Sequence, residues 1–198
     1  MRSSECRNRR KPMSELRFPI NERDHIVGPD DAPVTLVEYG DYQCPHCQAA
    51  WPQVELILRH FGDELRYAYR HFPISTAHPM AKPAAETAEF AGAHGLFWEA
   101  HSAIYANGSQ LSGSTLAAIV SGLGLDVADL QDALDQGACS SKIEFDFASG
   151  IRSGVNGTPC FFVNGKRHDG AYDAVSLSAA IDAARRDGAS NHVRIPLA

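Results

Sequence analysis

Two cysteines, Cys44 and Cys47, flank Pro45 and His46 in the stretch VEYGDYQCPHCQAAWPQVELIL, which spans residues 37–58. A pair at this spacing can bind a metal ion, lie inert in a protein core, or form and break a disulfide during catalysis. A metal site needs two further ligands, and the remaining cysteines are isolated from one another and from paired histidines: Cys6, Cys139 and Cys160. Redox chemistry is therefore the favoured interpretation, and we expect no bound metal and no organic cofactor.

The position of the pair supports this chemistry. Cys44 follows a strand-like run and precedes an amphipathic one, which predicts that it lies at the first turn of a helix, where Pro45 is well tolerated. Free backbone N–H groups and the helix dipole stabilise an anion there, so the Cys44 thiolate should form at a lowered pH. Cys47, one turn later, should be more buried and remain a thiol. His46 can donate hydrogen bonds or add positive charge beside the thiolate.

The elements around the motif follow from hydrophobic periodicity. Residues 33–40 form a β-rich run, and residues 64–72 alternate polar and apolar side chains. Between them, residues 49–61 carry apolar residues at helical spacing. This order predicts two parallel strands joined by a right-handed helical crossover.

The rest of the chain adds helices and a hairpin. Residues 76–138 are helical in character, and a further helix is predicted over residues 140–153. The stretch TPCFFVNGKRHDG predicts two strands joined by a turn at Asn164 and Gly165, and the last helix is predicted over residues 174–186. The predicted fold class is α/β, with a mixed central sheet flanked by helices and an inserted helical subdomain.

A family resemblance agrees with this layout. The CPHC motif after VEYGDYQ, together with the downstream GVNGTPCFFVNG, resembles the DsbA-like branch of the thioredoxin superfamily over roughly residues 18–186. The resemblance implies a thioredoxin fold and a thiol-disulfide oxidoreductase. The expected organisation is a disordered basic tail (1–17), a discontinuous thioredoxin-fold domain (18–75 and 139–188), the helical subdomain inserted within it (76–138), and a C-terminal tail (189–198).

The resemblance also implies roles for single residues. Cys44 matches the nucleophile of the family and Cys47 its resolving cysteine. Thr158 and Pro159 match the loop whose proline is cis and faces the cysteine pair, where the backbone of Thr158 can bind an extended peptide. Glu38 matches a buried acid that takes the proton of Cys47. The alternation along its strand leaves open a solvent-facing carboxylate instead.

Some residues depart from the family pattern or carry less information. Cys160 follows the proline, where we expect a buried small hydrophobe, and pairing with Cys139 is the less favoured alternative. Trp51 is a candidate for the rim of a peptide groove. Most of the scattered histidines are expected to be surface or capping groups, with no role in metal binding: His71, His78, His94, His101 and His168.

Composition limits the partners and the compartment. The 198 residues are 44% hydrophobic and 21% charged with a net charge of −6, which disfavours nucleic-acid binding. No apolar run approaches the ~20 residues that span a bilayer, so we expect no membrane partner. The basic N-terminus lacks the apolar stretch of a secretion signal, which favours the cytosol, and Met13 is an alternative start.

The sequence thus predicts disulfide exchange at Cys44 and Cys47 with protein or small-molecule thiols and disulfides. A redox partner protein or glutathione would renew the pair. The direction stays open, because the Pro-His filling favours an oxidant or isomerase whereas a cytosolic location favours a reductase. The alternative is a thioredoxin-fold module that binds extended peptides at Pro159 and can dispense with its cysteines.

Overall fold

The computed structural model describes residues 15–192, and for residues 189–192 only the helical backbone. Five strands form one mixed sheet in the order β1-β3-β2-β4-β5. The strands are β1 (His25–Val27), β2 (Val34–Gly40), β3 (Leu65–His71), β4 (Cys160–Val163) and β5 (Lys166–Arg167). β2 and β3 are parallel and the other pairs are antiparallel, which confirms the predicted mixed sheet.

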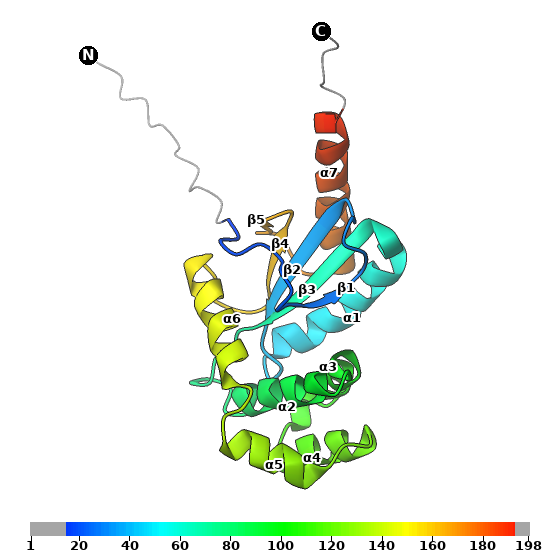
Figure 1. The fold of residues 1–198 in the computed structure, drawn as a ribbon. Helices are drawn as coiled ribbons and strands as arrows, with labels where there is room; N and C mark the ends of the chain where they lie inside the picture. The colour runs from blue at the N-terminus through cyan, green and yellow to red at the C-terminus, as the bar shows by residue number, and fades with distance from the viewer. Residues whose placement is uncertain (1–14, 193–198) are drawn as a thin grey trace, which may run out of the picture.

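Besides two short 3₁₀-helices, Gly62–Glu64 and Gly108–Gln110, seven α-helices accompany this sheet in the described part of the chain (Figure 1). They are α1 (Pro45–Phe61), α2 (Ala81–Ala93), α3 (Phe97–Ala106), α4 (Gly113–Gly122), α5 (Val127–Asp135), α6 (Ser140–Arg152) and α7 (Ala174–His192). In Figure 1, α1 and α6 lie on opposite sides of the strands, and α2 to α5 gather at one end of the molecule. No helix of the described residues is long and apolar enough to cross a membrane.

Two apolar cores cover the two faces of the sheet. The larger includes Leu36, Val54, Tyr67 and Leu177, and joins β2 and β3 to α1 and α7. The opposite face buries a second cluster around Val37, Ala68 and Phe162. Because neighbouring residues of a strand point to opposite faces, a strand buried on both faces can read as a continuous apolar run, as β4 does with its sequence CFFV. A third, smaller cluster joins α2, α4 and α5.

The hairpin predicted at Asn164 and Gly165 is present. Both residues have positive φ values, 44° and 77°, as the tight turn between two antiparallel strands requires. Glycine adopts such a φ without strain, and asparagine tolerates it better than most residues. The turn brings Lys166 against Val163 at the edge of the sheet.

One strand and two segment ends differ from the expectation. β1, which pairs with β3, was not predicted, because three residues are too short to show a period. Residues 15–17, expected in the disordered tail, are tied to the sheet: the Leu16 N–H donates to the Gly165 carbonyl at 2.8 Å. α7 runs to His192, past the expected end at residue 186. Residues 1–14, which include Cys6 and Met13, and residues 193–198 lie outside the described residues.

Candidate active site

Cys44 caps the N-terminus of α1. Its backbone is extended (φ −69°, ψ 121°), and Pro45 begins the helix, as predicted. The helix carries Cys47 one turn further on, where it is completely buried, whereas 5% of Cys44 is exposed. Both residues are free thiols in this structure. The sequence therefore places the two sulfurs on one helix end in different environments.

The two thiols differ in acidity. A hydrogen bond from the Cys47 side chain and the backbone N–H groups of His46 and Cys47 lower the pKa of Cys44 to about 5, against the opposing effect of burial. In its protonated form, Cys44 donates its S–H to the Thr158 carbonyl oxygen at 3.4 Å. Burial is the main cause that raises the pKa of Cys47 well above its ordinary value. At neutral pH Cys44 is a thiolate and Cys47 keeps its proton.

Glu38 lies beneath the pair, on β2. Only 1% of the residue is exposed, so the alternative of a solvent-facing carboxylate is wrong. Burial raises the pKa of Glu38 to about 7, although the Tyr67 hydroxyl donates a hydrogen bond of 2.7 Å to its Oε2 atom and opposes this effect. The charge of Glu38 is one of the causes that raise the pKa of Cys47. A carboxyl group with a pKa near neutrality can both accept and return a proton.

The loop before β4 faces Cys44. The peptide bond between Thr158 and Pro159 is cis. Pairing of β4 with β2 places Cys160 opposite Tyr39, which holds the start of β4 beside the strand that carries Glu38. The structure thus brings the two predicted segments, residues 44–47 and 158–159, to one site.

Two neighbours of the motif were not foreseen. The Tyr172 hydroxyl lies 3.0 Å from His46 Nδ1, across 126 positions of sequence. Asp41 is buried just before the helix, and its Oδ2 atom pairs with His78 Nδ1 at 2.8 Å. An aspartate three residues before a helix cap is a recognisable turn signal, but nothing in the sequence pointed to Tyr172.

Three of the five scattered histidines, His78, His94 and His168, are at least partly exposed, as expected of most of them. His94 is a capping group, since its Nδ1 atom lies 2.9 Å from the Phe90 carbonyl oxygen. His71 and His101, however, are buried.

Trp51 packs edge-on against His101, with ring centroids 4.3 Å apart, and is 8% exposed. It therefore belongs to an aromatic cluster rather than to an open rim.

The remaining described cysteines are free thiols. Cys160 is buried in the cluster around Val37 and Phe162, as expected of a small hydrophobe, and burial raises its pKa to about 11. Cys139 packs against a different cluster, in the helical subdomain. The two do not form a disulfide.

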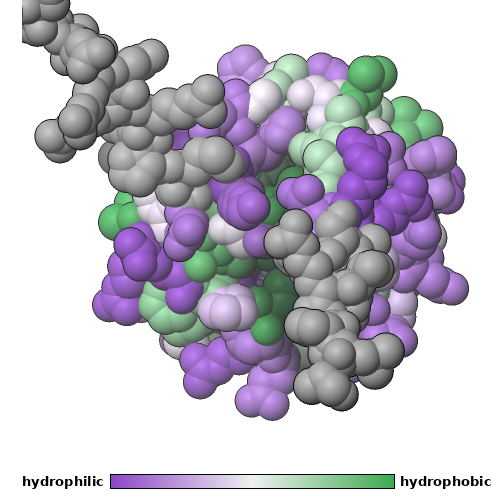
Figure 2. Space-filling view, turned by 90° about the horizontal axis from the view of Figure 1, so that it is seen from above, coloured by the Kyte–Doolittle hydropathy of each residue, from purple (hydrophilic) through white to green (hydrophobic). Residues whose placement is uncertain are grey.

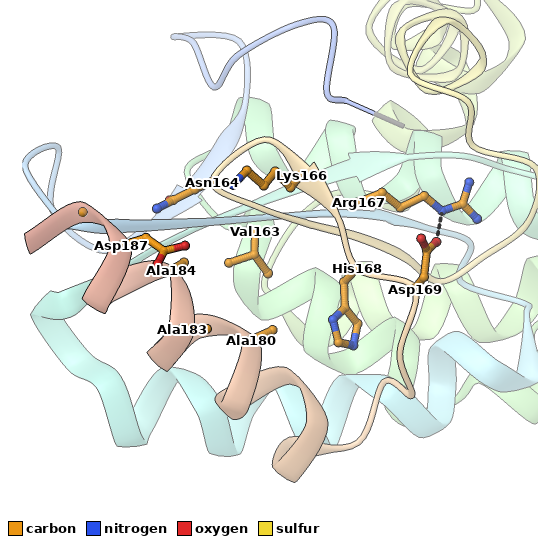
Figure 3. A pocket seen from close by; sticks show the side chains of 11 residues that line it. Val163, Asn164, Lys166, Arg167, His168, Asp169, Ala180, Ala183, Ala184 and Asp187 are labelled. Carbon is orange, nitrogen blue, oxygen red and sulfur yellow. Dashed lines mark ion pairs between the residues drawn. The ribbon is translucent and has the colours of Figure 1, made fainter. Parts of the chain in front are cut away.

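A pocket of about 620 Å³ lies elsewhere, between the β4–β5 hairpin and α7. Figure 3 shows His168 directed towards α7 and Arg167 paired with Asp169, at 3.2 Å. In Figure 2, which views the molecule from above, apolar residues line a hollow within a mostly hydrophilic surface. The pocket contains no predicted site residue; it is lined by Val163, Asn164, Lys166, Arg167, His168, Asp169, Ala180, Ala183, Ala184, Asp187 and Gly188.

Comparison with known proteins decides the family. A family model described as Thioredoxin matches residues 20–183. The chain belongs to the thioredoxin family. Among solved structures, this thioredoxin-family fold is similar to BdbD from Bacillus subtilis, with a TM-score of 0.77 and 21% identity over 88% of this chain and 97% of that one. Wolbachia pipientis α-DsbA1 gives a TM-score of 0.76 at 19% identity, covering 89% and 97% of the two chains.

Two further comparisons have higher sequence identity. A thioredoxin-like oxidoreductase from Silicibacter pomeroyi DSS-3 is 28% identical, with a TM-score of 0.72, over 84% of this thioredoxin-family chain and 94% of the other. A Na⁺/H⁺ antiporter NhaA 1 of Salinispora arenicola is 42% identical over 171 residues, which are 86% of this chain and 26% of the antiporter. The chain spans about a quarter of the length of the curated relatives it matches.

Proposed function

We propose that this protein is a thiol-disulfide oxidoreductase that exchanges disulfides with protein thiols through Cys44 and Cys47. The observation that carries the proposal is the division of acidity within the pair. Cys44 has a pKa of about 5, whereas the pKa of Cys47 is raised well above the ordinary value. One thiolate that attacks or leaves and one buried thiol that resolves are the two parts that exchange requires.

In the oxidised protein, a substrate thiolate attacks the Cys44 sulfur. A new disulfide forms between substrate and Cys44, the Cys44–Cys47 bond breaks, and the electron pair leaves on the Cys47 sulfur. Glu38, protonated in part at neutral pH, supplies a proton to that thiolate. A second substrate thiolate then attacks the substrate sulfur and releases Cys44 as a stabilised thiolate. The substrate is oxidised by two electrons and the protein pair is reduced.

The surface beside the motif supports a polypeptide substrate. A pocket of about 540 Å³ is lined by both apolar and polar residues of the β3–α2 loop and α6, by Lys82 of α2, and by Val155 and Asn156 of the loop that leads to Thr158. Its apolar residues include the partly exposed Phe147 and Ile151. This pocket would take an apolar side chain of a peptide that pairs with the Thr158 backbone.

The direction of exchange, the renewing partner and the cytosolic location stay predictions. A low pKa of the nucleophile stabilises the reduced form and so favours an oxidant. We infer no transport activity for this chain from the antiporter relatives, because the chain matches only about a quarter of their length.

A redox titration in glutathione buffers tests the proposal. Purified protein, trapped with an alkylating agent, should show one two-electron transition by mass. The transition should persist in Cys139→Ser and disappear in Cys44→Ser. Because Cys139 is also a free thiol but lies in another cluster, it is the matched control.

A peptide-binding measurement distinguishes disulfide exchange from the alternative function, a peptide-binding module. If wild-type protein shows no thiol change across the range and still binds cysteine-free peptides, exchange is wrong and a binding module replaces it. A transition whose midpoint lies well above the cytosolic glutathione potential would indicate an oxidant, and one near or below it a reductase.

A further inference from the structure

We propose that His25, His71 and Glu89 form a binding site for a divalent transition-metal ion, and that zinc is the ion this donor set fits best. The three residues come from three elements that meet at one edge of the sheet: β1, β3 and α2. The group contains neither cysteine of the redox pair. The proposal is therefore independent of the proposed oxidoreductase activity.

The donor atoms already converge. The Nε2 atoms of His25 and His71 lie 2.8 Å and 2.7 Å from the same atom, Glu89 Oε1. One ligand atom from each residue lies within 4.8 Å of the other two. Ligands bound at about 2.0–2.2 Å around a tetrahedral ion are separated by about 3.3 Å, so an ion needs these contacts to open by only about half an ångström.

The three donor groups are of the types that commonly bind zinc. Two imidazoles and one carboxylate are a ligand set found in open zinc sites, which keep a fourth position for water. The side chains of His25 and Glu89 are 21% and 12% exposed, whereas that of His71 is 1% exposed. The site therefore has a buried floor and one side that solvent can reach.

The protein holds the ligands in place before any ion arrives. The His25 ring is stacked on Phe97, with centroids 3.4 Å apart and planes 6° from parallel. The backbone N–H of His71 donates to Asp146 Oδ2 at 3.0 Å, which anchors the end of β3. Rings and backbone fixed in this way lose little freedom on binding, which favours a bound ion.

The local charges also favour a cation. In the described part of the chain, no lysine or arginine lies within ion-pair distance of Glu89, and its hydrogen-bond partners are the two imidazoles. Since no lysine or arginine competes for it, the Glu89 carboxylate is available to a divalent ion, which would take the place of its hydrogen bonds to the two imidazoles. His71 Nδ1 has no hydrogen-bond partner among the described residues, and a metal-bound imidazole is usually oriented through this second nitrogen. We therefore expect moderate rather than very tight binding.

An ion at this site would act as a clamp. It would join the three-residue edge strand β1 and the helical subdomain, through α2, to the central strand β3. Because the site exists only in the folded chain, binding stabilises the fold. The expected consequence is a melting temperature that rises with zinc concentration.

The test uses full-length protein with Cys44 and Cys47 oxidised to the disulfide, because free thiolates also bind zinc. Zinc is titrated in competition with a chromophoric chelator, and cobalt(II) serves as a spectroscopic probe. We expect one ion per chain, a rise in melting temperature, and a cobalt spectrum of nitrogen and oxygen ligands without a thiolate charge-transfer band.

Variants identify the ligands. Because the loss of outer-shell partners alone weakens metal sites 10- to 100-fold, His25→Ala and Glu89→Gln should each weaken zinc binding by about 100-fold or more. The matched controls His60→Ala and Glu64→Gln change exposed residues of the same types and should bind as wild type. Circular dichroism of the metal-free variants establishes that they are folded.

Either of two results would overturn the proposal. Wild-type protein that binds no zinc at tenfold molar excess, with no change in melting temperature, would show that the three residues are only a hydrogen-bonded cluster. Zinc binding that is unchanged in both Glu89→Gln and His25→Ala would place the ion elsewhere.

Discussion

At the scale of single residues, burial sets the acidity of the groups beneath the cysteine pair. Glu38 is a carboxylic acid enclosed by the sheet and α1, with the Tyr67 hydroxyl as its hydrogen-bond partner. The pKa of this group in the folded protein is about 7, against an ordinary value of 4.5. Burial disfavours the charged form of Glu38. Glu38 therefore stays partly protonated at neutral pH and has a proton that it can transfer to Cys47.

This pKa predicts a pH dependence of stability. Between about pH 4.5 and pH 7 the unfolded chain loses the Glu38 proton before the folded chain does, so stability falls as pH rises through this window. For a fully buried group the loss amounts to about 3 kcal/mol. Urea unfolding at pH 4.5 and pH 8 measures it, and Glu38→Gln should abolish it.

This measurement should be made on protein that also carries the Cys44→Ser substitution. The lowered pKa of Cys44 makes its thiolate stabilise the fold increasingly between about pH 5 and pH 9, which opposes the Glu38 effect. The exposed Glu64→Gln is the control and should leave the pH dependence intact. An unchanged slope in Glu38→Gln would show that Glu38 is not buried as described.

At the scale of elements, the N-terminus of α1 is held by one aspartate. Asp41 Oδ1 accepts the backbone N–H groups of Gln43 at 2.8 Å and Cys44 at 3.2 Å. Its Oδ2 atom accepts the N–H of Ile74 at 2.8 Å and pairs with His78. Asp41 therefore joins the helix that carries the redox motif to the loop that leads into the helical subdomain.

Removal of this carboxylate should be costly. Asp41→Ala removes the acceptor of the partly buried Gln43 and Ile74 N–H groups, one of the two acceptors of the Cys44 N–H, and the partner of His78, and we expect it to lower the free energy of unfolding by about 3 kcal/mol. Asp63, an exposed aspartate after the same helix, is the matched control, and Asp63→Ala should change stability by less than about 0.5 kcal/mol. Equal losses in the two variants, measured by urea unfolding, would contradict the assigned cap.

At the scale of the whole molecule, a buried arginine ties the N-terminal segment to the sheet. Arg70, on β3, is completely buried and donates to both carboxylate oxygens of Asp24 at 2.8 Å. Its other N–H groups donate to the Phe18 and Pro19 carbonyls and to the Tyr39 hydroxyl. A buried guanidinium with this many acceptors fixes the path of residues 18–24 across the sheet.

Breaking this ion pair should unfold the protein more readily. Arg70→Met leaves the Asp24 carboxylate buried without a counter-charge, and we expect a loss of about 3–5 kcal/mol in the free energy of unfolding. Arg66→Met on the same strand is the control, because its partner Asp30 is 92% exposed, and it should cost about 1 kcal/mol or less.

A double variant checks the mechanism. Arg70→Met combined with Asp24→Asn should lose less stability than the sum of the two single losses, since the unpaired charge is gone. Strict additivity in urea unfolding would contradict a coupled ion pair.

Features that depend on neighbours along the chain could be predicted from the amino-acid sequence. The spacing of Cys44 and Cys47 and the Pro45 that begins the helix are local signals, as is the Asn-Gly turn of the hairpin, and each predicted its structure. Hydrophobic periodicity is also a local signal, and it located the parallel strands β2 and β3. The family resemblance added the second segment, at Thr158 and Pro159.

Features that depend on which face of an element is buried, or on partners distant in sequence, became visible only in the folded chain. Period-two alternation cannot tell a core-facing Glu38 from a solvent-facing one, because the pattern has the same period on both faces. Tyr172 meets His46 across 126 positions, and His25 and Glu89 meet across 64. Such contacts come from packing of separate elements, and no local pattern encodes them.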